Sequence, residues 1–184
     1  MNDQKTLIRF FTIADYEEEE AFLRKQHNLG WKLKKTVPPC FFVFEKCAPE
    51  DVVYRLDYKN NTETGDYFQM FQDYGWERCG QCLGWLYFRK PASAMDSEQE
   101  GEIFSDDASR LAMVDHILKT RMLPLVIVFL CCLLPNFSRL LNDSGDPMHW
   151  FLLVLFSALM LLYIFLFLHC GRKLRRLRRR YARE

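Results

Sequence analysis

The longest uninterrupted run of hydrophobic positions lies near the C-terminal end of the chain. Residues 148–170 read MHWFLLVLFSALMLLYIFLFLHC, 23 positions without Asp, Glu, Lys or Arg. An α-helix rises about 1.5 Å per residue, so this run is long enough to cross a hydrocarbon core of about 30 Å. A core helix of a soluble protein would carry a polar stripe, and this run has none. We interpret it as a transmembrane helix.

A second apolar run precedes it. Residues 122–141 read MLPLVIVFLCCLLPNFSRLL, with Pro135, Asn136 and Arg139 interrupting the outer end. We interpret this run as a first transmembrane helix, with a re-entrant or interfacial segment as the alternative. Residues 142–147 then form a short outer loop, and the two spans make a transmembrane hairpin.

The first 90 residues contain one unit twice. Each copy opens with a β-rich run, at residues 7–13 and 52–58, and continues with a helical pattern. A Gly-Trp pair then ends the helix, at residues 30–31 and 75–76, where a left-handed glycine costs least. Two further strands follow, so the unit is strand–helix–strand–strand.

This repeat predicts an α+β fold, in which the strands form an antiparallel sheet with both helices on one face. The strand at residues 40–46 is apolar on both sides, which is typical of an interior strand covered twice. In the strand at residues 52–58, Arg55 and Asp57 alternate with apolar positions. One face of that strand is therefore expected to meet water or a ligand.

Three further segments connect or follow these parts. Residues 91–104 are acidic and poor in apolar side chains, which indicates a linker. Residues 105–121 predict a juxtamembrane helix. Residues 171–184 form a basic tail directly after the second span.

Charge is distributed unevenly. Residues 1–121 carry 16 Lys or Arg and 21 Asp or Glu, whereas residues 172–184 carry eight basic residues and one acid. Basic residues favour the cytoplasmic side of a membrane. The chain is therefore expected in the cell membrane as a two-pass protein with both termini in the cytoplasm.

The basic tail predicts contact with anionic lipids, at about 1 kcal/mol for each basic residue near the surface. The residues expected to make it are Arg172, Lys173, Arg175, Arg176, Arg178, Arg179 and Arg180. Direct nucleic-acid binding is disfavoured, because Tyr181 alone interleaves the charges.

Motifs for enzymatic chemistry are missing from the sequence. Cys79 and Cys82 have the C-x-x-C spacing, but Cys40 and Cys47 lie too far apart along one strand to complete a zinc site with them. The histidines are scattered, and there is no nucleophile elbow or phosphate-binding glycine loop. We therefore predict no enzyme, no metal and no cofactor.

Aromatic residues supply the candidate binding site. Tandem strand–helix–strand–strand units can leave a cleft that would suit an amphipathic small molecule. The residues expected to bind a ligand or partner are Arg55, Asp57, Trp31, Trp76, Trp85 and Tyr87. For the tryptophans that follow the two glycines, packing in the core is the alternative.

Several of these motifs together resemble a known family. They are F-x-x-x-D-Y-E-x-E-E-x-x-L from Phe11, G-W-K-L from Gly30, Y-R-L-D-Y from Tyr54, G-W-E from Gly75 and Y-F-R-K from Tyr87. In this pattern the first 90 residues are similar to the domain of unknown function 2812 family, which are bacterial proteins with membrane helices after this domain. The resemblance implies no catalytic residue. It implies a functional link to a PadR-type transcriptional regulator, because such proteins are often encoded beside one.

The sequence therefore predicts a membrane-anchored cytoplasmic sensor or regulatory module that binds a small ligand or a protein partner. The alternative is an accessory subunit that associates with a transporter or another membrane protein through its hairpin. If the first hypothesis holds, Arg55→Ala should abolish binding without unfolding the domain.

Overall fold

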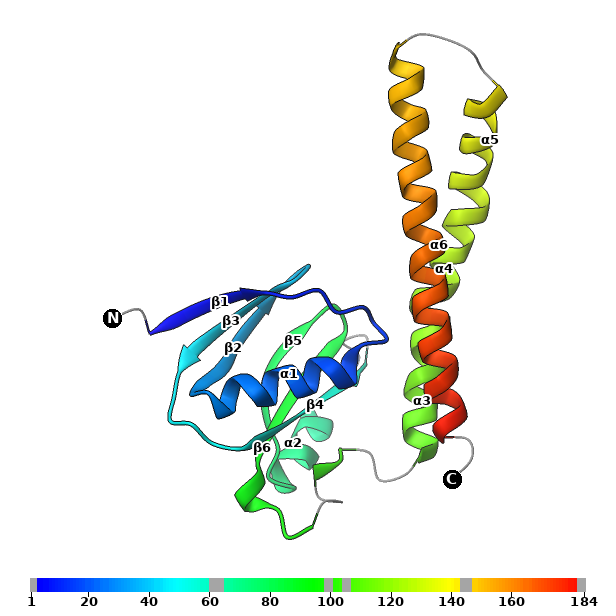
Figure 1. Ribbon diagram of the computed structural model, residues 1–184. Coiled ribbons are helices and arrows are strands. Elements are labelled where there is room, and N and C mark those ends of the chain that lie inside the picture. Colours follow the sequence, from blue (N-terminus) through cyan, green and yellow to red (C-terminus); the bar gives the residue numbers. More distant parts are fainter. Residues whose placement is uncertain (1–2, 60–64, 98–100, 104–106, 143–146, 182–184) are drawn as a thin grey trace. The chain divides into compact units, whose positions relative to one another are not determined.

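The computed structural model describes residues 3–59, 65–97, 101–103, 107–142 and 147–181 (Figure 1). The chain divides into two compact units, Met1–Ser109 and Arg110–Glu184. The first unit contains the strands, and the second is helical.

The first sheet has three antiparallel strands in the order β1-β3-β2. The elements are β1 (Gln4–Ile8), α1 (Tyr16–Asn28), β2 (Trp31–Val37) and β3 (Phe41–Lys46). Gly30 follows α1 with a φ of 81°. A side chain there would be strained, and its Cβ would lie 3.0 Å from the carbonyl oxygen of Cys47. The predicted left-handed helix end is confirmed.

The second sheet repeats this plan, with antiparallel strands in the order β4-β6-β5. Its elements are β4 (Val52–Tyr58), α2 (Gly65–Asp73), β5 (Glu77–Cys82) and β6 (Trp85–Pro91). Gly75 follows α2 with a φ of 79°. The α+β class and the repeated strand–helix–strand–strand order are therefore confirmed.

Helix α1 packs against both sheets. Its Phe22 ring lies 5.6 Å from the ring of Phe42 in the first sheet, and Leu23 beside it is fully buried. Its Tyr16 ring lies 5.6 Å from the ring of Trp85 in the second sheet. The helix is therefore the common core element of the two repeats.

Helix α2 covers the opposite face of the second sheet. Its Phe71 ring stacks on Phe88 of β6 at 4.6 Å, whereas the neighbouring Tyr87 points to α1. The strands thus hydrogen-bond as two sheets that share α1, and the helices contact opposite faces of the second. The prediction of a single sheet with both helices on one face is therefore corrected: there are two three-stranded sheets, and the helices lie on opposite faces of the second. The reason is that successive strand residues point to opposite faces, so Tyr87 of β6 meets α1 while Phe88 meets α2.

The exposure of two strands is also the reverse of the prediction. Strand β4 is buried on both faces, since α1 and α2 cover it from either side, and only Arg55 is partly exposed. Strand β3 buries Phe42 and Phe44 under α1, while Phe41 on its other face is 38% exposed. An apolar strand sequence alone does not show which faces other elements will cover.

The second unit is an antiparallel helical hairpin. Helical structure runs through α3 (Asp107–Ile117), the π-helical η3 (Leu118–Met122), α4 (Leu123–Val128), the π-helical η4 (Phe129–Leu133) and α5 (Leu134–Asn142), and α6 (Pro147–Tyr181) returns the chain. The Phe129 ring lies 5.9 Å from Tyr163 and 5.6 Å from Phe167. Asp115 and Arg178 form an ion pair at 3.4 Å in the same antiparallel register.

Two helices in this unit are long and apolar enough to cross a membrane. They are Ser109–Asn142 and Met148–Arg179, whose 18-residue apolar stretches have mean hydropathies of 2.2 and 2.9. Of the predicted outer loop 142–147, residues 143–146 lie outside the described part of the chain.

Candidate functional site

Ionisable side chains are buried where α1 packs on the second sheet. Glu19 of α1 is 6% exposed and accepts a 2.6 Å hydrogen bond from the hydroxyl of Tyr87 on β6. Burial raises the pKa of Glu19 to about 7, against the lowering effect of the Tyr87 hydrogen bond. Burial and the nearby Glu19 also raise the pKa of Tyr87. Glu19 therefore exchanges its proton near neutral pH, unlike a surface glutamate.

A second polar pair lies further along α1. The His27 Nδ1 atom is 2.8 Å from the hydroxyl of Tyr54 on β4, and both residues are buried. Burial and the guanidinium of Arg89 lower the pKa of His27, which favours the neutral imidazole. Arg89 itself is held by Glu77 through two hydrogen bonds of 2.8 and 2.7 Å.

The third group lies at the outer edge of β4, and we name it the Arg55 junction, formed by Glu20, Arg55 and Glu102. Glu20 accepts a 2.8 Å hydrogen bond from the backbone N–H of Leu56 and a 3.2 Å hydrogen bond from Arg55. Arg55 also donates to Glu102 at 2.9 Å. Burial raises the pKa of Glu20, and the Arg55 guanidinium opposes that shift. The junction thus places one guanidinium between two carboxylates.

Glu102 belongs to a short segment, residues 101–103, that we name the strap. Gly101 is buried, and a Cβ at this position would lie 3.4 Å from the sulfur of Met95. Ile103 packs against the apolar cluster between α2 and its sheet. That cluster consists of Val53, Phe71, Trp76, Leu86 and Phe88. Part of the predicted linker 91–104 is therefore docked on the α+β domain, while residues 98–100 and 104 lie outside the described residues.

The chemistry available at the junction is anion recognition. A guanidinium presents several N–H donors that suit a carboxylate or phosphate, and here it stands beside apolar side chains. The cysteines supply no reactive thiolate at this place. Cys79 donates to the carbonyl of Tyr87, and burial raises its pKa to about 12. Within the part of the chain that the structure describes, no group of three or more His, Cys, Asp or Glu could hold a metal ion.

Comparison with known proteins adds the family. Residues 15–127 match the family described as "Protein of unknown function (DUF2812)", and this is more than half of the 184 residues. The chain belongs to this family. The comparisons with curated proteins and with solved structures each find no match.

The DUF2812 match extends well beyond the motifs that first suggested it. It begins at the start of α1, includes both the second sheet and the strap, and ends within α4. The strap and the beginning of the first apolar helix are therefore part of the family's common sequence, together with the α+β domain from α1 onward.

Three of the predicted binding residues of this DUF2812 chain lie on the α2 side of the second sheet. Arg55 forms the junction, and Trp76 is buried in the apolar cluster. Asp57 is buried and accepts a short hydrogen bond from the hydroxyl of Tyr67 on α2. Of these three residues, only Arg55 is partly exposed.

The other three lie on the side that faces α1. Trp85 is buried between the rings of Tyr16 and Tyr58, and Tyr87 donates to Glu19. Trp31 belongs to the first sheet, with the Lys5 ammonium 4.5 Å from its ring. The six predicted residues therefore lie on the two faces of the second sheet and on the first sheet, and they do not form one site.

Neither buried glutamate was predicted from the sequence, although a signal was present. Residues 17–20 are four consecutive acids in α1. Successive helical residues turn by 100°, so four of them span most of the circumference and cannot all face water on a packed helix. Glu18 is exposed, whereas Glu19 and Glu20 point toward the second sheet.

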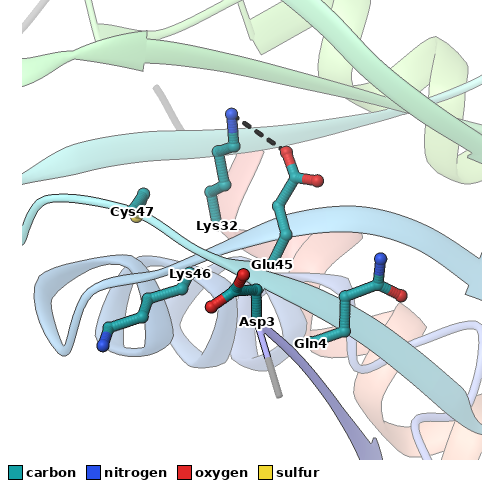
Figure 2. Close-up of a pocket in the computed structure, with 6 residues that line it drawn as sticks. All are labelled: Asp3, Gln4, Lys32, Glu45, Lys46 and Cys47. Carbon is teal, nitrogen blue, oxygen red and sulfur yellow. Dashed lines mark ion pairs between the residues drawn. The ribbon is translucent and has the colours of Figure 1, made fainter. Parts of the chain in front are cut away.

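A shallow hollow of about 470 Å³ lies on the first sheet, away from the junction. Figure 2 shows its polar lining, in which Lys32 and Glu45 form an ion pair of 2.9 Å. Asp3, Gln4, Lys46 and Cys47 complete it. The Lys32 ammonium holds the pKa of Glu45 below its usual range, so the charges already compensate one another. This hollow is a weaker candidate than the junction.

The predicted lipid-contacting residues continue α6 as helix. Arg172, Arg175, Arg176 and Arg179 are exposed, and Arg178 pairs with Asp115. Lys173 is half-buried, and the side chain of Arg180 lies outside what the structure describes.

Proposed function

We propose that this chain is a membrane-anchored cytoplasmic sensor or regulatory module without enzymatic activity. Its α+β domain binds an amphipathic anion, as a small molecule or as part of a protein partner. The helical hairpin holds that domain at the cell membrane, with both termini in the cytoplasm.

The exposed side chains of α6 support the membrane anchor. Large apolar residues such as Val154, Leu161 and Phe165 are 60–69% exposed. Each would cost about 1–2 kcal/mol to leave in water, and a bilayer removes that cost. Lys119, Arg121 and the basic end of α6 favour the orientation with cytoplasmic termini.

The observation that carries the proposal is the Arg55 junction. Arg55 joins α1, through Glu20, to the strap, through Glu102. The strap precedes α3 and the first apolar helix by only a few residues. Loss of the Arg55 contacts would therefore release the segment that leads to the membrane.

The strap itself indicates the ligand class. It places a carboxylate on Arg55 and an aliphatic side chain, Ile103, on the aromatic cluster. A ligand with the same two features, an anionic group next to an apolar group, would make the same contacts. Such an amphipathic anion would compete directly with residues 101–103.

The contacts that hold the strap are weak enough for a ligand to displace them reversibly. The Arg55–Glu102 pair is 24% and 35% exposed, and pairs of this kind contribute about 1 kcal/mol or less. Burying part of Ile103 adds about 1–2 kcal/mol. A ligand can displace contacts of this size without unfolding the domain, and its differential affinity shifts the strap from docked to released.

We expect Glu102→Gln to increase the affinity for amphipathic anions, because Arg55 loses its internal carboxylate competitor. A thermal-shift screen of the full chain in mild detergent would measure this, with decanoate and indole-3-acetate as probes. A ligand at 100 times its dissociation constant adds about 2.7 kcal/mol. Glu45→Gln is the matched control, because it removes the same charge from the hollow of Figure 2.

Equal responses of both variants and the wild type would place the ligand away from the junction. If no anion binds and a membrane protein copurifies instead, the chain is an accessory subunit that associates through its hairpin.

We also expect the chain to stay in the membrane pellet after extraction with alkaline carbonate, because both apolar helices would be embedded. Release into the supernatant, as for a peripheral protein, would rule out the membrane anchor.

A further inference from the structure

Helix α6 continues from its apolar part into its basic part without a break, from Pro147 to Tyr181. The rotational position of each side chain is therefore set by one helical repeat throughout. This allows the faces of the apolar and basic parts to be compared directly.

One face of α6 points toward the other helices of the hairpin. Tyr163 and Phe167 contact Phe129 on this face. Leu174 and Leu177 continue it at helical spacing, and both are buried. Protein contacts therefore occupy this side of α6 along both its apolar and its basic part.

Four arginines lie on the opposite face. They are Arg172, Arg175, Arg176 and Arg179, at the i, i+3, i+4 and i+7 spacing of one helical stripe. All four are exposed, and none has an ion-pair partner among the residues that the structure describes. We name them the arginine face. Arg178 lies off this stripe and pairs with Asp115.

The arginine face is in line with apolar residues that point away from the hairpin. Leu161, Phe165 and Leu168 precede Arg172 at intervals of four, three and four residues, so they share its side of the helix. These three side chains are exposed in the absence of a bilayer. The side of α6 that would contact acyl chains is therefore continuous with the arginine face.

We propose that the arginine face binds the headgroup phosphate of an anionic phospholipid whose acyl chains lie along Leu161, Phe165 and Leu168. Arg172 lies about 6 Å and Arg176 about 12 Å beyond Leu168 along the helix axis, which matches the depth of the headgroup region. Guanidinium groups bind phosphate oxygens in a bidentate manner. This inference rests on the membrane anchor of the proposed function.

The test compares two double variants of the full chain that remove the same charge. Arg175→Gln/Arg176→Gln changes the arginine face, and Lys173→Gln/Arg178→Gln changes the flanking positions. Native mass spectrometry of the delipidated chain in detergent would measure retention of phosphatidylglycerol against phosphatidylcholine. We expect the wild type to prefer phosphatidylglycerol. Loss of Arg175 and Arg176 should weaken that retention roughly thirty-fold, and the flanking pair should change it less than three-fold.

Equal weakening by both double variants would overturn the proposal, since it would show a general effect of charge. Equal retention of both lipids by the wild type would also overturn it. Carbonate extraction separates this failure from that of the proposed function. A chain that stays in the membrane without selecting phosphatidylglycerol contradicts only the arginine-face site, whereas an extracted chain contradicts the anchor itself.

Discussion

We expect Arg55→Ala to lower the free energy of unfolding of the α+β domain by about 3 kcal/mol at pH 9, because Glu20, whose pKa burial raises to about 8, is ionised there and loses its compensating charge. Glu20 is 11% exposed and would lose the guanidinium. The strap would lose its polar contact as well. The expectation from the sequence was that Arg55→Ala abolishes binding without unfolding the domain. Urea unfolding of the full chain in mild detergent, followed by tryptophan fluorescence, measures the effect.

Two further variants make this prediction specific. Arg24 and Asp51 form a 2.6 Å pair whose side chains are 45% and 48% exposed. Arg24→Ala should therefore cost less than about 1 kcal/mol. Adding Glu20→Gln to Arg55→Ala should recover much of the lost stability, because the buried charge is then gone. If Arg55→Ala is as mild as Arg24→Ala, the junction does not hold the domain together.

The second large effect concerns Glu19 and pH. Its pKa is about 7 in the folded domain and near 4.5 in an unfolded chain. The folded state therefore binds the proton more tightly, and this contribution to stability is fully present below pH 4.5 and is lost as the pH rises through about 7. We expect Glu19→Gln to be more stable than the wild type at pH 8, by up to about 3 kcal/mol, and at pH 5 by less than about 1 kcal/mol.

The comparison of wild type and Glu19→Gln isolates this group. The lowered pKa of His27 gives the opposite pH dependence below its unfolded value, but His27 is present in both proteins. Urea unfolding at pH 5, 6, 7 and 8 gives the difference directly. A difference that does not change with pH would show that Glu19 is ionised throughout. Tyr87→Phe removes the hydrogen bond to Glu19 and should raise the carboxyl pKa further.

These predictions depend on residues whose burial the sequence did not reveal. The acidic run at residues 17–20 resembles a solvated helix face, and only contact of α1 with a second sheet makes two of its members interior. That contact joins residues far apart in the chain, such as Glu19 and Tyr87. Local periodicity does not encode such a pairing, since the same helix pattern would suit one covered face or two.

The docking of the strap is a second feature that the sequence did not reveal. Residues 91–104 have the composition of a linker, with few apolar side chains. One glutamate and one isoleucine are enough to dock part of it, because Arg55 and an aromatic cluster are already in place. Composition measures the average tendency of a segment to stay solvated, whereas docking depends on the few contacts that a folded surface offers.

The sequence by itself determined the features that depend on local order. The two apolar helices follow from length and the near absence of charge, the repeat from its spacing, and the helix ends from Gly30 and Gly75. Only the tertiary structure decided which faces are covered, that α1 serves two sheets, and that Arg55 joins Glu20 to Glu102. The physical reason is that burial and the pairing of charges are properties of surfaces brought together by folding, and no single segment contains both partners.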